Sequence, residues 1–178
     1  QLQDGDVIEV LFTADYTQEP GMLLPFTDVS WDHWAYSAVK RVYTRGLMVG
    51  VSDTSFAPGQ TLSRAMLASI LYRLAGEPAV TAENPFTGVP ADRWYTDAVI
   101  WAAENGIVVG CGDGTFRPNA PATRAQTAVM LYAYANFAGR NTSQRADLSA
   151  FADAADVPSW ALAEMQWAHA AQLILGRD

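Results

Sequence analysis

The sequence is poor in cysteine and in long apolar runs, and each shortage excludes a class of protein. Cys111 is the only cysteine among 178 residues, so no disulfide can form within the chain. No stretch approaches the ~20 consecutive apolar residues that a membrane-spanning helix needs. Half of the residues are hydrophobic, which is typical of a folded chain and excludes wholesale disorder. The sequence therefore predicts a folded, soluble protein without membrane insertion.

Positive charge is also scarce. The chain has 19 acidic and 11 basic residues and a formal net charge of −8, which argues against binding to nucleic acid. Lys40 is the only lysine, so all other basic residues are arginines. Codon usage is one explanation of this bias. Bidentate recognition of carboxylate or phosphate by selected arginines is the other, and their positions must decide.

An internal repeat organises most of the chain. Two segments match without gaps when 60 is added to each residue number, and a weaker third copy begins near Phe151 with an offset of 66. The first offset relates Phe26 to Phe86, Val29 to Val89, Trp34 to Trp94, Gly46 to Gly106, Gly50 to Gly110, Asp53 to Asp113, Phe56 to Phe116, Pro58 to Pro118 and Arg64 to Arg124. The second offset relates Trp94 to Trp160 and Trp101 to Trp167, and the third copy stops after its first half.

Each full copy has the pattern of a helix, a loop and a second helix. From Trp34 onward, apolar residues recur at the spacing of one helical face, and Gly46 is placed to end that helix. A glycine-rich loop follows, in which Phe116 is expected to plug into the core. The fold class predicted is therefore all-α, with tandem helix-loop-helix repeats.

The second helices have well-defined starts. Ser63 and Thr123 are good N-cap residues, and an arginine occupies the first helical position after each of them. Thr123 and Gln126 also match the capping box, in which the second side chain returns a hydrogen bond to the cap. In the first copy Met66 replaces that glutamine, so only the forward bond is expected.

The N-terminal segment differs from the repeats. Residues 7–12 have the composition of a short β-strand and follow a turn signal at 4–6. We therefore expect residues 1–25 to be the end of a preceding β-rich domain or a strap packed on the repeats. No signal peptide is present, so a targeting segment is expected to lie outside this chain.

These residues together resemble the S-layer homology (SLH) module, whose closing motif is Thr-Arg-Ala-Glu. The first copy is carried by Phe26-Thr-Asp28-Val29, Trp34, Ala38-Val39, Gly46-Leu47, Gly50, Phe56, Pro58 and Leu62-Ser63-Arg64-Ala65. The second runs from Phe86-Thr-Gly-Val89 to Thr123-Arg-Ala-Gln126. The resemblance divides the chain into modules at 26–80, 81–140 and 141–178, the last being a first half only.

The resemblance implies a pseudo-threefold, all-helical unit at the bacterial cell surface. Such units are non-catalytic and need no cofactor. They bind secondary cell-wall polysaccharide, or another acidic glycan linked to peptidoglycan, and the sugars often carry pyruvyl ketals. The grooves lie between neighbouring modules, and the motif arginine meets the anionic ketal.

Four residues at the second helix starts are candidate glycan contacts: Ser63, Arg64, Thr123 and Arg124. A forked cation beside the unpaired amides and the positive end of a helix dipole is suited to an anion. The alternative is that the arginines are salt-bridged surface residues. Replacing either arginine with alanine is expected to weaken glycan binding while leaving the fold intact.

Two tryptophans and two glycines complete the candidate site. Trp34 and Trp94 would offer aromatic faces to a sugar ring, although a tryptophan at a helix start is more commonly a core anchor. Gly50 and Gly110 would let a ligand approach the backbone closely, or they serve turn geometry.

Other interpretations are weaker. Asp28 and Asp153 are expected to cap the helix entries, and Asp113 is expected to form a turn. His33 and His169 lack ligand-spaced partners, so no metal site is predicted, and no catalytic motif is present. The alternative function is that of a structural assembly module of a surface-layer protein that has lost glycan binding. The incomplete third module could then support self-association.

Overall fold

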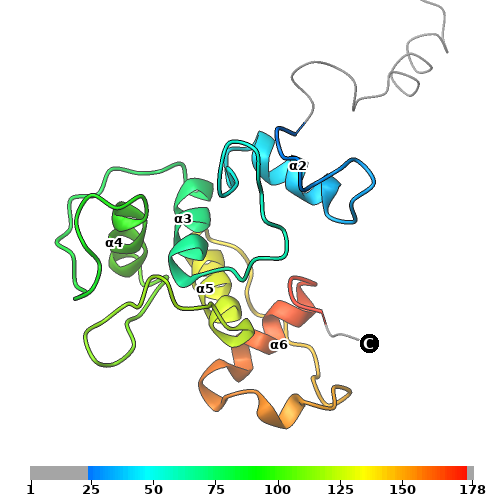
Figure 1. Cartoon of the computed structure of the whole chain (residues 1–178). Helices are drawn as coiled ribbons and strands as arrows, with labels where there is room; N and C mark the ends of the chain where they lie inside the picture. Colours follow the sequence, from blue (N-terminus) through cyan, green and yellow to red (C-terminus); the bar gives the residue numbers. More distant parts are fainter. Residues whose placement is uncertain (1–23, 176–178) are drawn as a thin grey trace, which may run out of the picture. The chain divides into compact units, whose positions relative to one another are not determined.

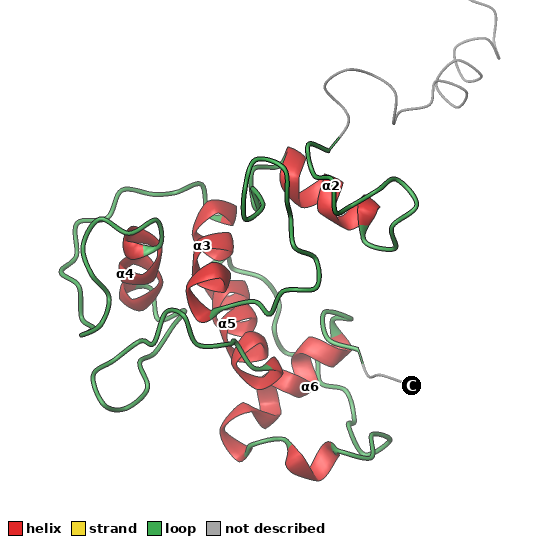
Figure 2. Cartoon of the chain, viewed as in Figure 1, coloured by secondary structure: helices red, strands yellow, loops and turns green. Residues whose placement is uncertain are grey.

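The computed structural model describes residues 24–175, which form helices joined by long loops (Figures 1 and 2). The helices are α2 (Tyr36–Thr44), α3 (Arg64–Leu74), α4 (Thr96–Glu104), α5 (Arg124–Phe137) and α6 (Leu162–Ala170), with short 3-10 turns η1 (Ala154–Asp156) and η2 (Ser159–Ala161) before α6. Residues 24–175 contain isolated β-bridges but no strand, so the predicted all-α class is confirmed there. The strand predicted at 7–12 lies outside the described residues.

The helix boundaries follow the offsets found in the sequence. Helix α4 begins and ends 60 positions after α2, and α6 begins and ends 66 positions after α4. Helix α5 begins 60 positions after α3 and is longer at its C-terminal end. The first helices begin two residues after Trp34 and Trp94, because a hydrogen-bonded turn precedes each of them.

The chain divides into two compact units after Gln60. The first unit holds α2 and a small core of Phe26, Val29, Ala35 and Val39. The Phe26 ring packs edge-on against Tyr43, with 5.0 Å between the ring centres. The predicted threefold arrangement of the modules stays a prediction.

The second unit contains helix pairs that join successive repeats. Helix α3 packs on α4, α5 packs on α6, and α3 also contacts α5. Phe116 from the glycine-rich loop is fully buried among these helices, as predicted, and burial of such a ring contributes about 2–3 kcal/mol to stability. Trp101 and Trp167, which are equivalent under the second offset, are both buried.

The helix-ending glycines are confirmed, whereas the predicted helix caps at Asp28 and Asp153 are wrong. Gly46 and Gly106 have φ values of 68° and 66°, the left-handed conformation that ends a helix. Asp28 does not cap a helix: its carboxylate accepts hydrogen bonds from Ser55 Oγ (2.7 Å) and from the amides of Phe56 (2.9 Å) and Ala57 (2.7 Å). It therefore ties the loop after α2 to the segment before α2.

Asp153 also fails as a helix cap, because its side chain makes no cap hydrogen bond to η1.

Candidate functional site

The predicted caps of the second helices are present. Ser63 Oγ accepts from the Met66 amide at 3.2 Å, and Thr123 Oγ1 accepts from the Gln126 amide at 3.2 Å. Gln126 Oε1 accepts in return from the Thr123 amide, which completes the capping box. Both cap oxygens therefore accept hydrogen bonds within the protein, and they fix the start of the helix whose first residue is the arginine.

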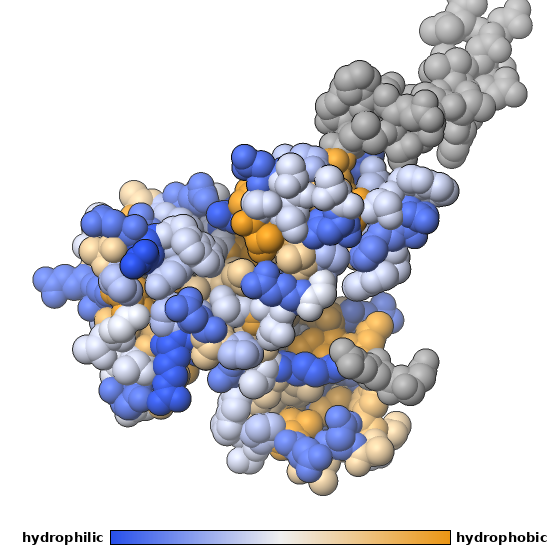
Figure 3. Space-filling view, viewed as in Figure 1, coloured by the Kyte–Doolittle hydropathy of each residue, from blue (hydrophilic) through white to orange (hydrophobic). Residues whose placement is uncertain are grey.

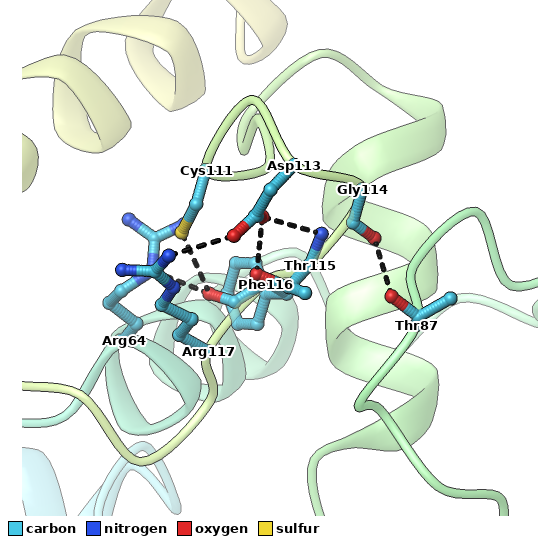
Figure 4. A network of polar contacts seen from close by, with 8 residues as sticks. All are labelled: Arg64, Thr87, Cys111, Asp113, Gly114, Thr115, Phe116 and Arg117. Carbon is cyan, nitrogen blue, oxygen red and sulfur yellow. Dashed lines mark hydrogen bonds and ion pairs between the residues drawn. The ribbon is translucent and has the colours of Figure 1, made fainter.

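Arg64 is buried rather than presented to solvent. Its Nε donates to the Phe116 carbonyl at 2.9 Å (Figure 4). Its Nη2 donates to the Val109 carbonyl at 3.0 Å. The guanidinium also lies 4.6 Å from the centre of the Phe116 ring, within cation–π range. Burial lowers the pKa of Arg64. The alternative of a salt-bridged surface residue is wrong here, because its hydrogen-bond partners are carbonyls in a covered site.

The N-terminus of α3 lacks the unpaired amides that we expected beside Arg64. The Arg64 amide donates to the Ala120 carbonyl and the Ala65 amide to the Pro118 carbonyl, both at 3.0 Å. With the Ser63 cap, these contacts engage the donors of the first turn. The positive end of α3 is therefore used to hold the loop at 118–120.

Arg124 repeats one of these contacts but remains exposed. Its Nη2 donates to the Leu175 carbonyl, and Leu175 is equivalent to Val109 under the offset of 66. The same guanidinium nitrogen thus reaches the same carbonyl position of the following repeat at both places. Both arginines tie a second helix to the segment that follows the first helix of the next repeat.

A hollow of about 500 Å³ adjoins Arg124. Its lining is mainly apolar and includes two ionisable side chains besides the arginine, those of Asp153 and His169. The apolar lining residues include Leu148, Phe151, Val157, Met165, Ile174 and Leu175. The hollow therefore offers one accessible cation at the edge of an apolar surface.

The tryptophans that precede the first helices lie in solvent. Trp34 is 86% exposed and Trp94 is 60% exposed, so the alternative that they are core anchors is wrong, whereas their contact with a sugar stays a prediction. Trp160, their counterpart in the third copy, is 59% exposed. The buried tryptophans are instead the later ones, Trp101 and Trp167. The repeat thus maintains an accessible indole at one equivalent point.

Gly50 and Gly110 are explained by packing inside the loop. A Cβ at Gly50 would lie 2.6 Å from Phe26 Cε1 and 2.7 Å from the Ser55 carbonyl oxygen. At Gly110 it would lie 2.9 Å from the Thr115 oxygen and 3.0 Å from Phe86 Cε1. The close approach that these glycines permit is therefore made by the protein itself, and a ligand role for them stays a prediction.

Asp113 forms the predicted turn and holds a side chain that the sequence analysis did not single out. Its carboxylate accepts from Thr115 Oγ1 (2.6 Å), the Thr115 amide (3.0 Å) and Arg117 Nη2 (2.7 Å) (Figure 4). These hydrogen bonds hold the pKa of Asp113 well below its usual range and raise that of Arg117. The Asp113 turn therefore positions the Arg117 guanidinium.

A second hollow, of about 590 Å³, lies beside Trp94. It is lined by Gly88, Pro90, Arg93, Trp94, Tyr95, Arg117, Pro118, Asn119 and Ala120. Of these lining residues only Trp94 is a site candidate from the sequence, because the candidates are residues that both repeats share. The signal for Arg93 and Arg117 is a difference, since His33 and Ala57 stand at the equivalent positions of the first repeat.

Residues 24–175 hold neither a cluster of metal-ligating side chains nor a helix suited to crossing a membrane. No group of three or more His, Cys, Asp or Glu side chains in residues 24–175 is arranged to hold a metal ion. Among the helices of the same range, none has the length and apolar character required to cross a membrane.

The fold and this site define an all-helical tandem-repeat module with exposed tryptophans and arginines. Residues 25–66 and 87–128 each match the family model of the S-layer homology domain. The two matched segments are S-layer homology modules, as the resemblance predicted. The family model does not extend to residues 141–178.

Relatives with curated names place such segments in large surface proteins. The chain is 34% identical over 145 residues to the surface-layer 125 kDa protein of Lysinibacillus sphaericus. These residues make up 82% of this chain and 12% of that protein. It is 28% identical over 106 residues to the S-layer protein sap of Bacillus anthracis (60% of this chain, 13% of that protein). The protein is therefore located at the bacterial cell surface and contains a cell-surface anchoring module.

Some relatives bear the names of enzymes. An endoglucanase of Bacillus sp. strain KSM-635 is 27% identical over 164 residues, which are 92% of this chain but 17% of the enzyme. The chain thus spans less than a fifth of the length of each of these three relatives.

Proposed function

We propose that this segment is a non-catalytic module that anchors its parent protein by binding an acidic secondary cell-wall polysaccharide, whose sugars carry pyruvyl ketals. The observation that supports this most is the repeated exposure of Trp34 and Trp94 at equivalent positions. A large apolar ring left in water at the same point of successive repeats is characteristic of an interaction surface. Its flat face is suited to the apolar face of a sugar ring.

The arginines divide between two roles in this proposal. Arg124 is exposed at the start of α5, beside the positive end of the helix, and would contact the carboxylate of the ketal. Arg64 is engaged by two carbonyls and would act on the glycan indirectly, by holding the loop from Val109 to Phe116. Ser63 and Thr123 would also act indirectly, because they cap the helices and so fix the positions of the arginines that follow them.

We also propose that residues 141–178 are the first half of a third module, after modules at 26–80 and 81–140. Helix α6 has the length and register of α4. The exposed Trp160 and the buried Trp167 repeat the exposed Trp94 and the buried Trp101. The strap or preceding domain expected at residues 1–25 lies, apart from residues 24 and 25, outside the described residues.

A second candidate function is assembly with other surface proteins. Leu162, Leu173 and Leu175 are each exposed by more than 40% of their surface, and Figure 3 shows apolar surface beside α6. Exposed apolar side chains near both ends of α6 suit self-association as well as a partner protein. Assembly without glycan binding would leave sedimentation with cell walls unaffected by loss of the tryptophans.

Sedimentation with purified sacculi tests the proposal. Trp34→Ala and Trp94→Ala are each expected to weaken retention roughly tenfold, because stacking on the indole would be lost. Arg124→Ala is expected to weaken it as well. The matched control is Trp31→Ala, which removes an exposed indole that has an alanine, Ala91, at its equivalent position. Equal losses in all the variants, or none, would contradict the proposal.

A further inference from the structure

The turn that carries Trp34 is stabilised by a histidine ring. The Ala35 amide donates to His33 Nδ1 at 3.1 Å, and Ala35 itself is buried. The His33 amide donates to the Ser30 carbonyl at 2.9 Å, and the His33 carbonyl accepts from the Tyr36 amide at 2.8 Å. His33 is therefore bound through its ring and through both of its backbone groups, directly before the exposed Trp34.

The partner of this ring nitrogen defines the protonation state of His33. A backbone amide is a donor only, so Nδ1 must accept through its lone pair and carry no proton. The bond therefore exists only in the neutral imidazole whose proton is on Nε2. Protonation of the ring places a proton on Nδ1 and removes this acceptor. It also adds a positive charge just before α2, where the helix dipole disfavours a cation.

The same ring packs against the indole that follows it. The ring centres of His33 and Trp34 are 5.5 Å apart, and the ring planes are tilted by 33°. The His33 side chain is half-buried, whereas the indole is exposed. The neutral imidazole thus both holds the backbone beside Trp34 and contacts the indole itself.

The second repeat stabilises the equivalent turn, before Trp94, without an ionisable acceptor. Arg93 stands where the first repeat has His33, and a guanidinium has donors only. Thr96 Oγ1 accepts instead from the Arg93 amide at 3.0 Å and donates to the Pro90 carbonyl at 2.7 Å. A threonine hydroxyl does not titrate in the physiological range. The turn of the second repeat is therefore an internal control within the same chain.

The charged groups around His33 leave the imidazole as the group that titrates. Ser30 Oγ donates to Asp32 Oδ1 at 2.6 Å and holds the pKa of Asp32 below its usual range, so this neighbouring carboxylate stays ionised. On α2, Lys40 Nζ lies 6.0 Å from the centre of the Tyr36 ring. The remaining ionisable side chains of residues 24–60 are Asp28, Arg41, Tyr43, Arg45 and Asp53. Aspartate, tyrosine, lysine and arginine ordinarily keep their charge between about pH 8 and about pH 5.5.

From this arrangement we propose that His33 is a positioning residue for Trp34, and that protonation of its imidazole releases the turn and weakens the anchoring contribution of Trp34 below about pH 6. The inference rests on the proposed function for the contact between Trp34 and the glycan. It adds a regulation of that contact. The first module holds its indole more firmly at neutral than at mildly acidic pH, whereas the second module does not respond.

The first test is nuclear magnetic resonance of the full chain between about pH 8 and about pH 5.5. At the higher pH the His33 ring is expected to be the Nε2–H tautomer, with the Ala35 amide protected from hydrogen exchange. At the lower pH that protection, corrected for the intrinsic rate, is expected to fall about threefold to fivefold, as for loss of one modest hydrogen bond. The Arg93 amide is expected to keep its protection. An Nδ1–H tautomer at the higher pH, or unchanged protection of Ala35, would overturn the proposal.

Two variants separate the acceptor from the charge. His33→Asn keeps an acceptor that can bind the amide two residues on and does not titrate, whereas His33→Ala has no acceptor. On sacculi, the natural chain is expected to be retained as well as His33→Asn at about pH 8 and about threefold to fivefold less at about pH 5.5. His33→Ala is expected to be weaker than His33→Asn at both. His169 is present in all three proteins, so its titration cancels from these ratios.

Repeating the comparison in a Trp34→Ala background shows whether His33 acts through the indole. There the ratio between the His33 form and His33→Asn is expected to be the same at both pH values. A ratio that is constant in the natural background, or one that still changes without Trp34, would overturn the positioning role while the anchoring function stands. Absence of retention for every protein at every pH would refute anchoring, and a pH-dependent protection of Ala35 would still support the titration of this turn.

Discussion

At the scale of single residues, the two motif arginines show why position within the fold matters more than residue type. Arg64 and Arg124 occupy equivalent sequence positions and donate to equivalent carbonyls. Only Arg64 is also covered by the Phe116 ring. The sequence could predict that both arginines begin a helix, because the caps before them are local. It could not predict their different burial, which depends on a loop that lies 52 residues further along the chain.

The first prediction concerns the stability contributed by Arg64, and it replaces the expectation of an unchanged fold. Arg64→Ala is expected to lower the free energy of unfolding by about 2–3 kcal/mol, because two covered carbonyls lose their donors. Arg124→Ala, at an exposed site, is expected to cost less than ~1 kcal/mol. Urea unfolding of both variants measures the difference. Equal stabilities of the two variants would show that the Arg64 contacts have no structural role.

At the scale of helices and loops, the sequence predicted what is local and failed where a long-range contact decides. The apolar periodicity, the caps and the helix-ending glycines located the four helices of the first two repeats to within about two residues. The role of Asp28 could not be predicted, because its partners at 55–57 follow α2 in the sequence whereas Asp28 precedes it. The choice between an accessible indole and a core anchor at Trp34 and Trp94 was also beyond the sequence, and a hydrogen-bonded turn separates each exposed indole from its helix.

The second prediction concerns the loop that Asp28 holds. Hydrogen bonds from Phe56, Ser55 and Ala57 lower the pKa of Asp28 to about 2 in the folded protein. The folded pKa lies below the unfolded value, so this carboxylate stabilises the fold above about pH 4, and the contribution is lost as pH falls from about 4 to 2. Thermal unfolding between pH 6 and 2 should therefore show a steeper decline for the natural chain than for Asp28→Asn.

Asp153→Asn is the control for that comparison, because the Asp153 side chain makes no cap bond. It should retain the steep decline of the natural chain. Parallel curves for the natural chain and Asp28→Asn would show that the Asp28 contacts do not stabilise the folded state.

At the scale of the whole molecule, a net charge of −8 and an anionic partner are compatible because the cations are local. Arg124 and Arg93 each stand beside a hollow, and an exposed tryptophan accompanies Arg93. Local fields of this kind act within about 8 Å at physiological salt, so the charge of distant acidic side chains is largely screened. The scarcity of lysine agrees with this picture, since arginine is the better partner for a carboxylate.

The most direct test of the anchoring function is sedimentation of the natural chain with sacculi before and after acid extraction of the secondary polysaccharide. The account predicts that the protein sediments with intact sacculi and stays in the supernatant with extracted sacculi. Equal sedimentation with both preparations would contradict it.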